Sequence, residues 1–179
     1  MDSVIVKDKL FTPFIEEEAI QEAVQEVSKQ INEDYHGKSP LFIGVLNGSF
    51  MFFGDLLKLI DVNCKVSFVK MASYEGTSST GEINELIGLA ENIEQEDVIL
   101  VEDIVDTGNT LDRLIELLVD KKAKSIKVAT LLYKPDAYKK KHPIDYKGIE
   151  IPNKFVVGYG LDYDGFGRNL KSIYVINNN

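Results

Sequence analysis

Apolar and polar positions alternate along the chain in ways that predict helices and strands. Within residues 16–35, apolar side chains recur every three or four positions from Ile20 to Ile31, which predicts a helix with one buried face. Gly37 is expected to end this helix. The next segment, 41–46, is apolar throughout, as is typical of a strand buried on both faces.

Similar patterns predict the remaining elements. Residues 73–82 are rich in Ser, Thr and Gly and predict a mobile loop, whereas 83–90 are ambiguous, a β-arm being one interpretation. Strands that alternate with helices indicate an α/β fold with a mainly parallel sheet, whose ligands bind at the carboxyl ends of the strands. Two further helices are expected at 50–60 and about 109–121, and further strands at 64–71, 97–103, 125–133, 155–160 and 172–177.

Composition narrows the class of protein. The 179 residues are 44% hydrophobic and 27% charged, without repeats or a Pro/Gly/Ser-rich linker, so one domain over residues 1–179 is expected. The net charge of −9 argues against binding to nucleic acid or to an anionic membrane. No apolar run approaches the roughly 18 residues of a membrane span, and the N-terminus lacks the apolar core of a signal peptide.

The few cysteines and histidines exclude two kinds of site. Cys64 alone cannot form an internal disulfide, and with His36 and His142 it is too little for a structural zinc site. We interpret Cys64 as a small buried apolar residue and both histidines as facing solvent. A chain without a disulfide fits a reducing, cytoplasmic location.

Charge is distributed unevenly along the sequence. Residues 61–120 carry 3 basic and 14 acidic side chains, whereas 121–179 carry 12 basic and 5 acidic ones. Most of these charges are expected to lie on solvated faces. An alternative is that the acidic centre holds a divalent metal while a basic segment contacts an anionic substrate.

Residues 98–111, VILVEDIVDTGNTL, carry the densest chemical signal. An apolar strand ends in Glu102 and Asp103, Asp106 follows, and the next four residues open a helix. Backbone N–H groups at a helix start can bind phosphate, and Gly108 permits close approach or a positive φ. Paired carboxylates suit ribose hydroxyls or hydrated magnesium, and Asp106 could accept or donate a proton.

A structural explanation of the same segment is that Asp106 and Thr107 only cap the helix. Capping does not explain two adjacent acids directly after an apolar strand. A phosphate or sugar site is therefore the favoured interpretation.

The segment resembles the signature of the type I phosphoribosyltransferases, in which an apolar strand leads to two acids and then to Asp-Thr/Ser-Gly-x-Thr. The implied fold has a mainly parallel central sheet flanked by helices, with a small hood over the base site. The resemblance runs from about residue 10 to about 176. It narrows to the hypoxanthine-guanine (6-oxopurine) phosphoribosyltransferases on IGVLNGSFMFFGDL (43–56), VKMASY (69–74), LLYKP (131–135) and PNKFVVGYGLDYDGFGR (152–168).

The resemblance implies a purine salvage reaction. Hypoxanthine or guanine would react with phosphoribosyl pyrophosphate (PRPP) to give IMP or GMP and pyrophosphate, with Mg²⁺ as cofactor. A homodimer or homotetramer is the implied assembly. Because the oxocarbenium-like state reacts readily with water, closure of the loop 73–82, with Ser73 and Tyr74, would protect it.

The resemblance also implies residues for the sugar and phosphates. Glu102 and Asp103 would contact the ribose hydroxyls, directly or through magnesium. Pyrophosphate would be bound by Arg168 and by the turn of Asn47 and Gly48. The 5-phosphate would be bound by Asp106, Thr107, Gly108, Asn109 and Thr110.

For the purine, the resemblance implies a second group of residues. Asp106 would act as general acid/base at N7, and Lys134 would contact O6. Phe155 would stack on the base, the backbone of Val156 would contact its edge, and Asp162 would bind a second magnesium ion at the purine side.

Without the resemblance, several of these residues have simpler explanations. Lys134 could extend along the surface at a strand end, and Phe155 could belong to the core. Asp162 could form a turn, and Arg168 could pair with one of the many acids.

Two positions depart from the family pattern. Asn47 and Asn109 stand where many relatives have Lys, so each lacks a positive charge near an anion. Because the backbone N–H groups remain, we expect binding to persist, with weaker affinity for PRPP or stronger dependence on magnesium.

Other functions stay open. Xanthine is not excluded as the base, whereas Lys134 and Phe155 argue against a pyrimidine. A regulatory protein that binds nucleotide or RNA without turnover is a different class, against which the acidic charge and Asp106 argue. A phosphatase or response-regulator domain built on Glu102 and Asp103 would form an acyl phosphate.

Overall fold

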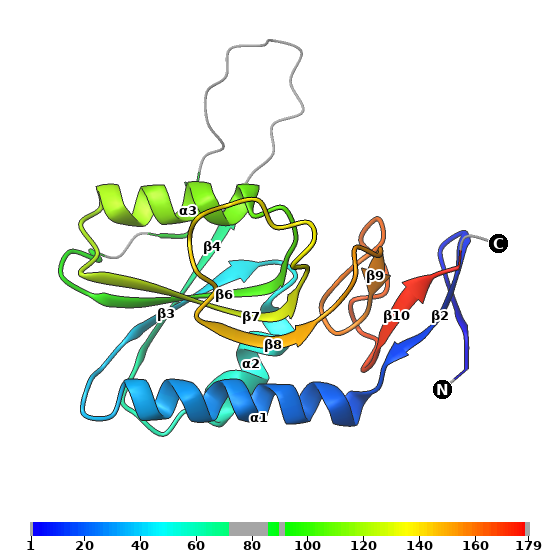
Figure 1. Cartoon of the computed structure of the whole chain (residues 1–179), viewed down its shortest axis with the longest axis horizontal. Helices are drawn as coiled ribbons and strands as arrows, with labels where there is room; N and C mark the ends of the chain where they lie inside the picture. The colour runs from blue at the N-terminus through cyan, green and yellow to red at the C-terminus, as the bar shows by residue number, and fades with distance from the viewer. Residues whose placement is uncertain (1, 72–85, 90–91, 178–179) are drawn as a thin grey trace, which may run out of the picture.

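A mainly parallel sheet forms the centre of the computed structural model, which describes residues 2–71, 86–89 and 92–177 (Figure 1). Its strand order is β5–β4–β3–β6–β7–β8, and only the β4–β5 pair is antiparallel. The strands are β3 (Leu41–Leu46), β4 (Lys65–Met71), β5 (Leu86–Ile87), β6 (Asp97–Val105), β7 (Ser125–Tyr133) and β8 (Tyr146–Glu150).

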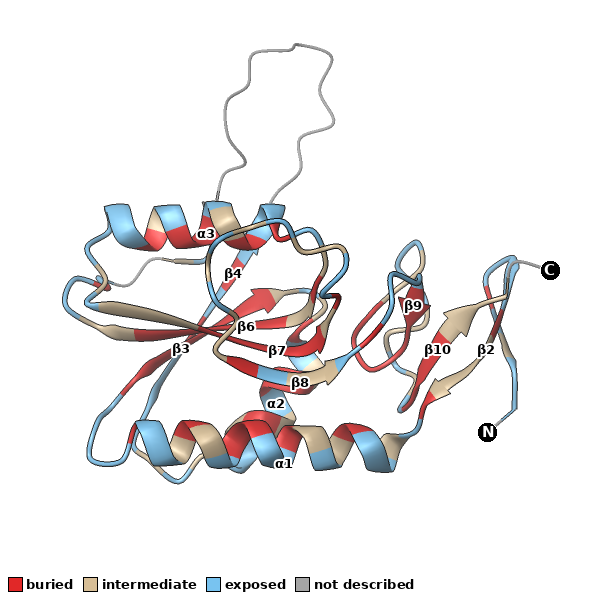
Figure 2. Ribbon diagram, in the orientation of Figure 1, coloured by how far each residue is buried: buried red, intermediate tan, exposed pale blue. Residues whose placement is uncertain are grey.

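Within the described residues, three helices cover the two faces of this sheet. Helices α1 (Glu17–Asp34) and α2 (Phe50–Lys58) pack on one face and α3 (Asn109–Asp120) packs on the other (Figure 1). Each helix turns a stripe of buried residues towards the strands, while its other side is exposed (Figure 2). Apolar side chains at helical spacing therefore build a core on both sides of β3 and β6, whose residues are mostly buried.

A second, antiparallel sheet lies beyond the carboxyl ends of the parallel strands (Figure 1). It corresponds to the expected hood. Its order is β1–β2–β10–β9, so the N-terminal hairpin pairs with a strand near the other end of the chain. The strands are β1 (Val4–Val6), β2 (Lys9–Ile15), β9 (Val156–Val157) and β10 (Ile173–Ile176).

Most expected elements are present, and some expectations are wrong. The strand expected at 155–160 is only β9, because Gly158 and Gly160 adopt φ of 102° and 99° and bend the chain away from β10. Strands β1, β2 and β8 were not expected. Cys64 is exposed rather than buried, because it precedes β4 where the chain lies at the surface. His36 is exposed as expected.

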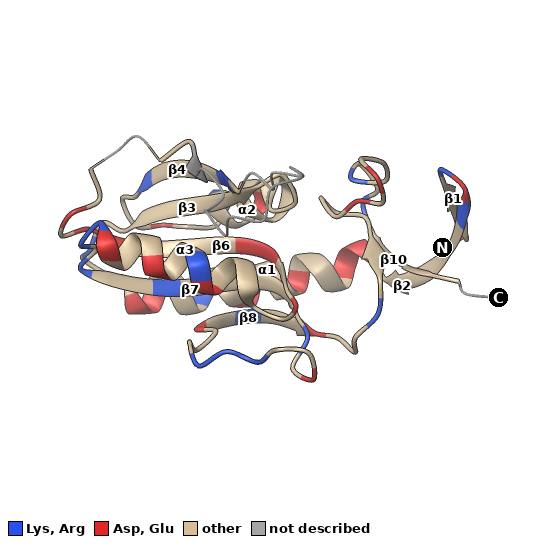
Figure 3. Cartoon of the chain, turned by 90° about the horizontal axis from the view of Figure 1, so that it is seen from above, with Lys and Arg blue, Asp and Glu red and all other residues tan. Residues whose placement is uncertain are grey.

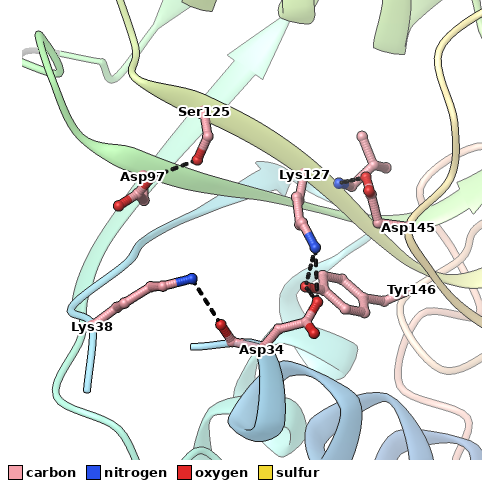
Figure 4. A network of polar contacts seen from close by, with 8 residues as sticks. Asp34, Lys38, Asp97, Ser125, Lys127, Asp145 and Tyr146 are labelled. Carbon is pink, nitrogen blue, oxygen red and sulfur yellow. Dashed lines mark hydrogen bonds and ion pairs between the residues drawn. The ribbon is translucent and has the colours of Figure 1, made fainter. Parts of the chain in front are cut away.

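A polar network ties the end of α1 to β7 and β8 (Figure 4). The carboxylate of Asp34 accepts a hydrogen bond from the hydroxyl of Tyr146 and pairs with the ammonium of Lys127, each at 2.7 Å. These hydrogen bonds hold the pKa of Asp34 below its ordinary value. Lys127 lies near the start of β7. The network is therefore at the amino-terminal end of the parallel strands, whereas the hood lies beyond their carboxyl ends.

Candidate active site

Several of the predicted site residues lie at the carboxyl ends of β3, β6 and β7. Strand register places Val105 beside Tyr133, so the residues that follow, Asp106 and Lys134, leave neighbouring strands together. The backbone N–H of Lys134 donates to the carbonyl of Val105 at 3.0 Å. This is the edge at which a parallel sheet is expected to bind its ligands.

An ion pair joins Lys134 to Asp106. The Lys134 ammonium lies 2.6 Å from the Asp106 carboxylate and 3.5 Å from the side-chain oxygen of Asn153. The Lys134 side chain is 7% exposed, whereas that of Asp106 is 44% exposed. The interpretation of Lys134 as a lysine extending along the surface is therefore wrong. A buried ammonium beside an accessible carboxylate can donate to a ligand oxygen while the carboxylate accepts a proton.

Glu102, which is buried, and Asp103, which is partly buried, form an acidic pair at the end of β6. Burial raises the pKa of Glu102 well above its ordinary value, and the charge of Asp103 raises it further. Burial raises the pKa of Asp103 to about 6, although the backbone N–H of Ile104 and the charge of Arg168 act in the opposite direction. Two carboxyl groups that are costly to ionise favour a cation or hydroxyl donors beside them.

The turn between β3 and α2, residues 47–49, packs directly on this acidic pair. A Cβ atom at Gly48 would lie 1.6 Å from the carboxylate oxygen Oδ2 of Asp103, so only glycine fits there. The hydroxyl of Ser49 is buried and has no hydrogen-bond partner among the described residues. The β3–α2 turn therefore lies directly against Asp103.

A small cavity lies at the start of α3. Its volume is about 100 Å³, and it is lined by Glu102 and by every residue from Ile104 to Leu111. Gly108 adopts φ of 83° and is the N-cap of α3, where no side chain forms a capping hydrogen bond. The explanation of Asp106 and Thr107 as helix caps is therefore wrong. Helix-start N–H groups without a side-chain cap can bind an anion.

The β7–β8 connection packs against this cavity wall. A Cβ atom at Gly108 would lie 2.5 Å from the ring of Tyr138 and 2.9 Å from Cγ of Lys140. The Lys140 ammonium lies 2.9 Å from the carboxylate of Asp112 in the first turn of α3. Basic side chains are frequent on this connection, whereas α1 and α3 carry many acids (Figure 3). A basic segment of the C-terminal third thus adjoins the candidate phosphate site.

Residues 158–168, which we call the hood strap, carry Asp162 and Arg168. The Arg168 guanidinium lies 2.7 Å from Oδ1 of Asp162 and donates to the carbonyl of Gly160 at 2.6 Å. The backbone N–H of Gly165 donates to Oδ2 of Asp162 at 2.6 Å. Both simpler explanations, an ion pair for Arg168 and a turn for Asp162, therefore describe this structure. Both side chains are partly exposed and open to a ligand.

Phe155 is an exposed aromatic side chain, not a core residue. It is 47% exposed, and its ring centroid lies 6.0 Å from that of Tyr163 and 6.3 Å from that of Phe11. The neighbouring Val156 is buried and pairs with Val175 in β10. An exposed ring held by two others can stack on a flat ligand.

Other predicted features lie outside the described residues or have no counterpart within them. Ser73, Tyr74 and the expected loop 73–82 lie outside the described residues. Asn109 and Thr110 are exposed at the start of α3. Within the described ranges, no three His, Cys, Asp or Glu side chains form a metal-binding group. No helix in those ranges is long and apolar enough to cross a membrane.

Sequence reasoning missed Asn153, which accepts from Lys134 although it lies 19 positions further along the chain. Its only signal is its place before Phe155 in the segment PNKF. It also missed Asp55 and Tyr159, whose side chains meet behind the hood strap.

The sequence is similar to that of known proteins, which share one family. The phosphoribosyl transferase domain family matches residues 15–164. The hypoxanthine-guanine phosphoribosyltransferase of Staphylococcus aureus strain Mu50 is 44% identical over 158 residues, 88% of either chain. The bifunctional protein TilS/HprT of Listeria monocytogenes strain F2365 is 42% identical over 90% of this chain, which spans only 25% of that protein's length.

The structure is also similar to a solved one. This is a point mutant of the hypoxanthine phosphoribosyltransferase of Trypanosoma cruzi, complexed with the product IMP. It is 35% identical, with a TM-score of 0.84 over 93% of this chain and 90% of that one. Sequence and structure thus point to the same group of proteins.

Proposed function

Because the chain belongs to the phosphoribosyltransferase family, we propose that it transfers the phosphoribosyl group of PRPP to hypoxanthine or guanine. The products are IMP or GMP and pyrophosphate. The observation that carries this proposal is the pair of Lys134 and Asp106, which adjoins the acidic pair of β6 and the anion cavity at α3. A cation and a proton acceptor side by side match O6 and N7 of a 6-oxopurine.

The base is bound and deprotonated by residues from β6, β7 and the hood. The ammonium of Lys134 donates to O6, which selects a 6-oxopurine over adenine. Asp106 accepts the N7 proton as N9 forms its bond to C1′. Phe155 stacks on the ring, and the backbone of Val156 contacts its edge; the exposure of the Phe155 ring supports this role.

PRPP is bound across the carboxyl ends of the parallel strands. Residues 106–110 bind the 5-phosphate in the cavity at α3, and Glu102 and Asp103 contact the ribose hydroxyls. Asn47, Gly48 and Arg168 bind the pyrophosphate, which leaves with the electron pair of its bond to C1′. Fixed donors around a leaving anion stabilise its developing charge.

The donor set fits magnesium. Glu102, Asp103 and Asp162 offer carboxylate oxygens, and burial raises the pKa of the first two, so a bound cation would favour their ionised forms. Magnesium in such sites is held by one or two carboxylates together with substrate phosphates, so a cage of protein ligands is not required. When bound, the ion would supply positive charge to the pyrophosphate oxygens.

The proposal extends to assembly and location. Exposed apolar side chains on α2 and β4, among them Phe50, Val66 and Phe68, support a homodimer or homotetramer. A cytoplasmic location is supported by the exposed thiol of Cys64, since reducing conditions keep such a group free. We also propose that residues 1–179 act as one catalytic domain.

A spectrophotometric assay tests the proposed function. PRPP and magnesium are supplied with hypoxanthine, guanine, xanthine or adenine in separate reactions, and one series contains EDTA. We expect turnover of hypoxanthine and guanine, none of adenine, and loss of turnover with EDTA. If no base were turned over but nucleotide bound tightly, the protein would have a regulatory role instead of a catalytic one. An acyl phosphate on the protein would instead indicate phosphoryl transfer.

Lysine at Asn109 is expected to lower the KM for PRPP by about threefold to tenfold, because it adds a charge beside the bound 5-phosphate. The side chain at 109 is exposed at the first position of α3, so a lysine fits there. Steady-state kinetics with hypoxanthine in excess gives the value. Glu116→Gln, exposed about two turns further along α3, changes the net charge equally and serves as control. An unchanged KM for PRPP in Asn109→Lys would contradict the charge argument.

A further inference from the structure

Asp55 on α2 joins three segments of the chain. Its Oδ2 accepts hydrogen bonds from the hydroxyl of Tyr159 at 2.5 Å and from the amide of Gln21 on α1 at 3.2 Å. Its Oδ1 lies 2.6 Å from the ammonium of Lys58. Although burial raises the pKa of Asp55, these hydrogen bonds keep it below its ordinary value, so Asp55 is a carboxylate. The hood strap is thereby tied to the helix that follows the β3–α2 turn.

Tyr159 is the buried end of this connection. Its side chain is only 2% exposed, and its backbone φ of 49° is unusual for a residue other than glycine. Its backbone N–H donates to the carbonyl of Leu170 at 2.8 Å. A buried phenol needs a hydrogen-bond acceptor, and the carboxylate of Asp55 is a strong one. The start of the hood strap is therefore fixed in one position.

The hood strap also presses on the β3–α2 turn. A Cβ atom at Gly160 would lie 2.1 Å from the carbonyl oxygen of Gly48, so the two backbones are in direct contact. Gly48 in turn packs on Asp103, as described above. Because Gly160 also accepts from Arg168, a shift of the strap would move the guanidinium relative to the turn. Three segments that carry proposed PRPP ligands thus meet in one tightly packed contact.

We infer that Asp55 and Tyr159 are positioning residues for the pyrophosphate half of PRPP. Their hydrogen bond sets the distance between the hood strap, which carries Arg168, and the β3–α2 turn. This inference rests on the proposed function and assigns to it two residues that lie outside the substrate site. Neither residue touches substrate; each acts through the backbone of the strap.

The base side of the hood is held independently. Val156 and Val157 pair with Val175 and Tyr174 of β10, and these pairs do not involve Asp55. Loss of the hydrogen bond from Tyr159 to Asp55 should therefore loosen pyrophosphate binding and leave binding of the purine in place. A general loss of structure would affect both substrates alike.

Tyr159→Phe tests the inference, because it removes the hydroxyl and keeps the buried ring. We expect the KM for PRPP and the inhibition constant of pyrophosphate to rise about tenfold, while the KM for hypoxanthine stays within about twofold. Asp55→Asn, which keeps an acceptor but loses the charge, should show the same pattern with a smaller rise. Both are measured by steady-state kinetics, with thermal unfolding of each variant in parallel.

Tyr146→Phe is a matched control. It removes another hydrogen bond from a buried tyrosine to an aspartate, that to Asp34, which also pairs with a lysine (Figure 4). Tyr146 lies at the start of β8, at the end of the parallel strands that is away from the hood. We expect a similar loss of thermal stability and unchanged constants for PRPP and pyrophosphate.

The outcomes separate the inference from the proposed function. Turnover by the unchanged protein, with a selective rise for PRPP and pyrophosphate in Tyr159→Phe, supports both. Turnover with no selective rise, or with an equal rise in Tyr146→Phe, overturns the inference and leaves the proposed function intact. Absence of turnover in the unchanged protein overturns both.

Discussion

The substitution Asp106→Asn is expected to lower the rate of IMP formation by about 100- to 10,000-fold, which is the usual contribution of a general acid/base. An amide cannot accept the N7 proton, so the purine would have to lose that proton to water. The amide oxygen can still accept a hydrogen bond from Lys134, which keeps the buried ammonium partly compensated. The KM for PRPP should therefore change by less than about threefold.

Single-turnover kinetics measures this effect without interference from product release, which limits kcat in many enzymes. Asp136→Asn is the matched control, since it removes the same charge from an exposed position two residues after Lys134. It should retain the rate of the unchanged protein. A rate for Asp106→Asn within about threefold of that value would assign the proton transfer to another group.

The larger sheet could be predicted from the sequence because its central strands are buried on both faces. The segment 41–46 is a continuous apolar run, and the strand predicted at 97–103 contains another at 98–101, so both could be recognised without their partners. Strand β8, with the sequence YKGIE, lies at the edge of the sheet, and its mixed composition gives no such signal.

The hood could not be predicted in the same way. Its strand β2 is stabilised by pairing with β10, so that Ile15 lies opposite Ile173 from the other end of the chain. In FVVGYG the apolar run continues through residue 159, but the left-handed conformation of Gly158 ends the strand. The local pattern of apolar and polar residues does not indicate which distant strand a segment pairs with, nor where the backbone changes direction.

The candidate site divides along the same line. Glu102 and Asp106 could be found because they belong to one short motif at the end of a strand, whose residues line a common cavity. The pairing of Asp106 with Lys134 follows from the adjacency of β6 and β7. The contacts of Asn153 and of Tyr159 depend on how the hood folds back, which no single segment encodes.

The substitution Asp103→Asn is expected to stabilise the fold and to impair the reaction. The pKa of Asp103 is about 6, above the value of about 3.9 in an unfolded chain. The folded protein therefore binds this proton more tightly, and ionising the group costs stability. The cost is absent below about pH 4, grows as the pH rises from about 4 to about 6, and is complete above that.

At pH 8, Asp103→Asn should therefore raise the free energy of unfolding by about 1–3 kcal/mol, and the gain should vanish near pH 4. Asparagine can keep the hydrogen bond from the N–H of Ile104. Chemical denaturation between pH 4 and pH 8 measures the difference. The same variant should lower kcat/KM for PRPP about 10- to 100-fold, because a charged ligand of the ribose side is lost.

Asp97 provides the control at the other end of the same strand. Hydrogen bonds from Lys124 and Ser125 hold its pKa below the ordinary value, so its stabilising effect is present at neutral pH and is lost as the pH falls. Asp97→Asn should thus destabilise the fold at pH 8 and leave kcat/KM unchanged, which reverses both effects expected of Asp103→Asn. If Asp103→Asn were instead less stable than the unchanged protein at pH 8, burial of an ionised carboxyl group at the ribose site would not carry the cost that we assign to it. An acid that is kept on β6 at a cost in stability is expected where that acid binds substrate.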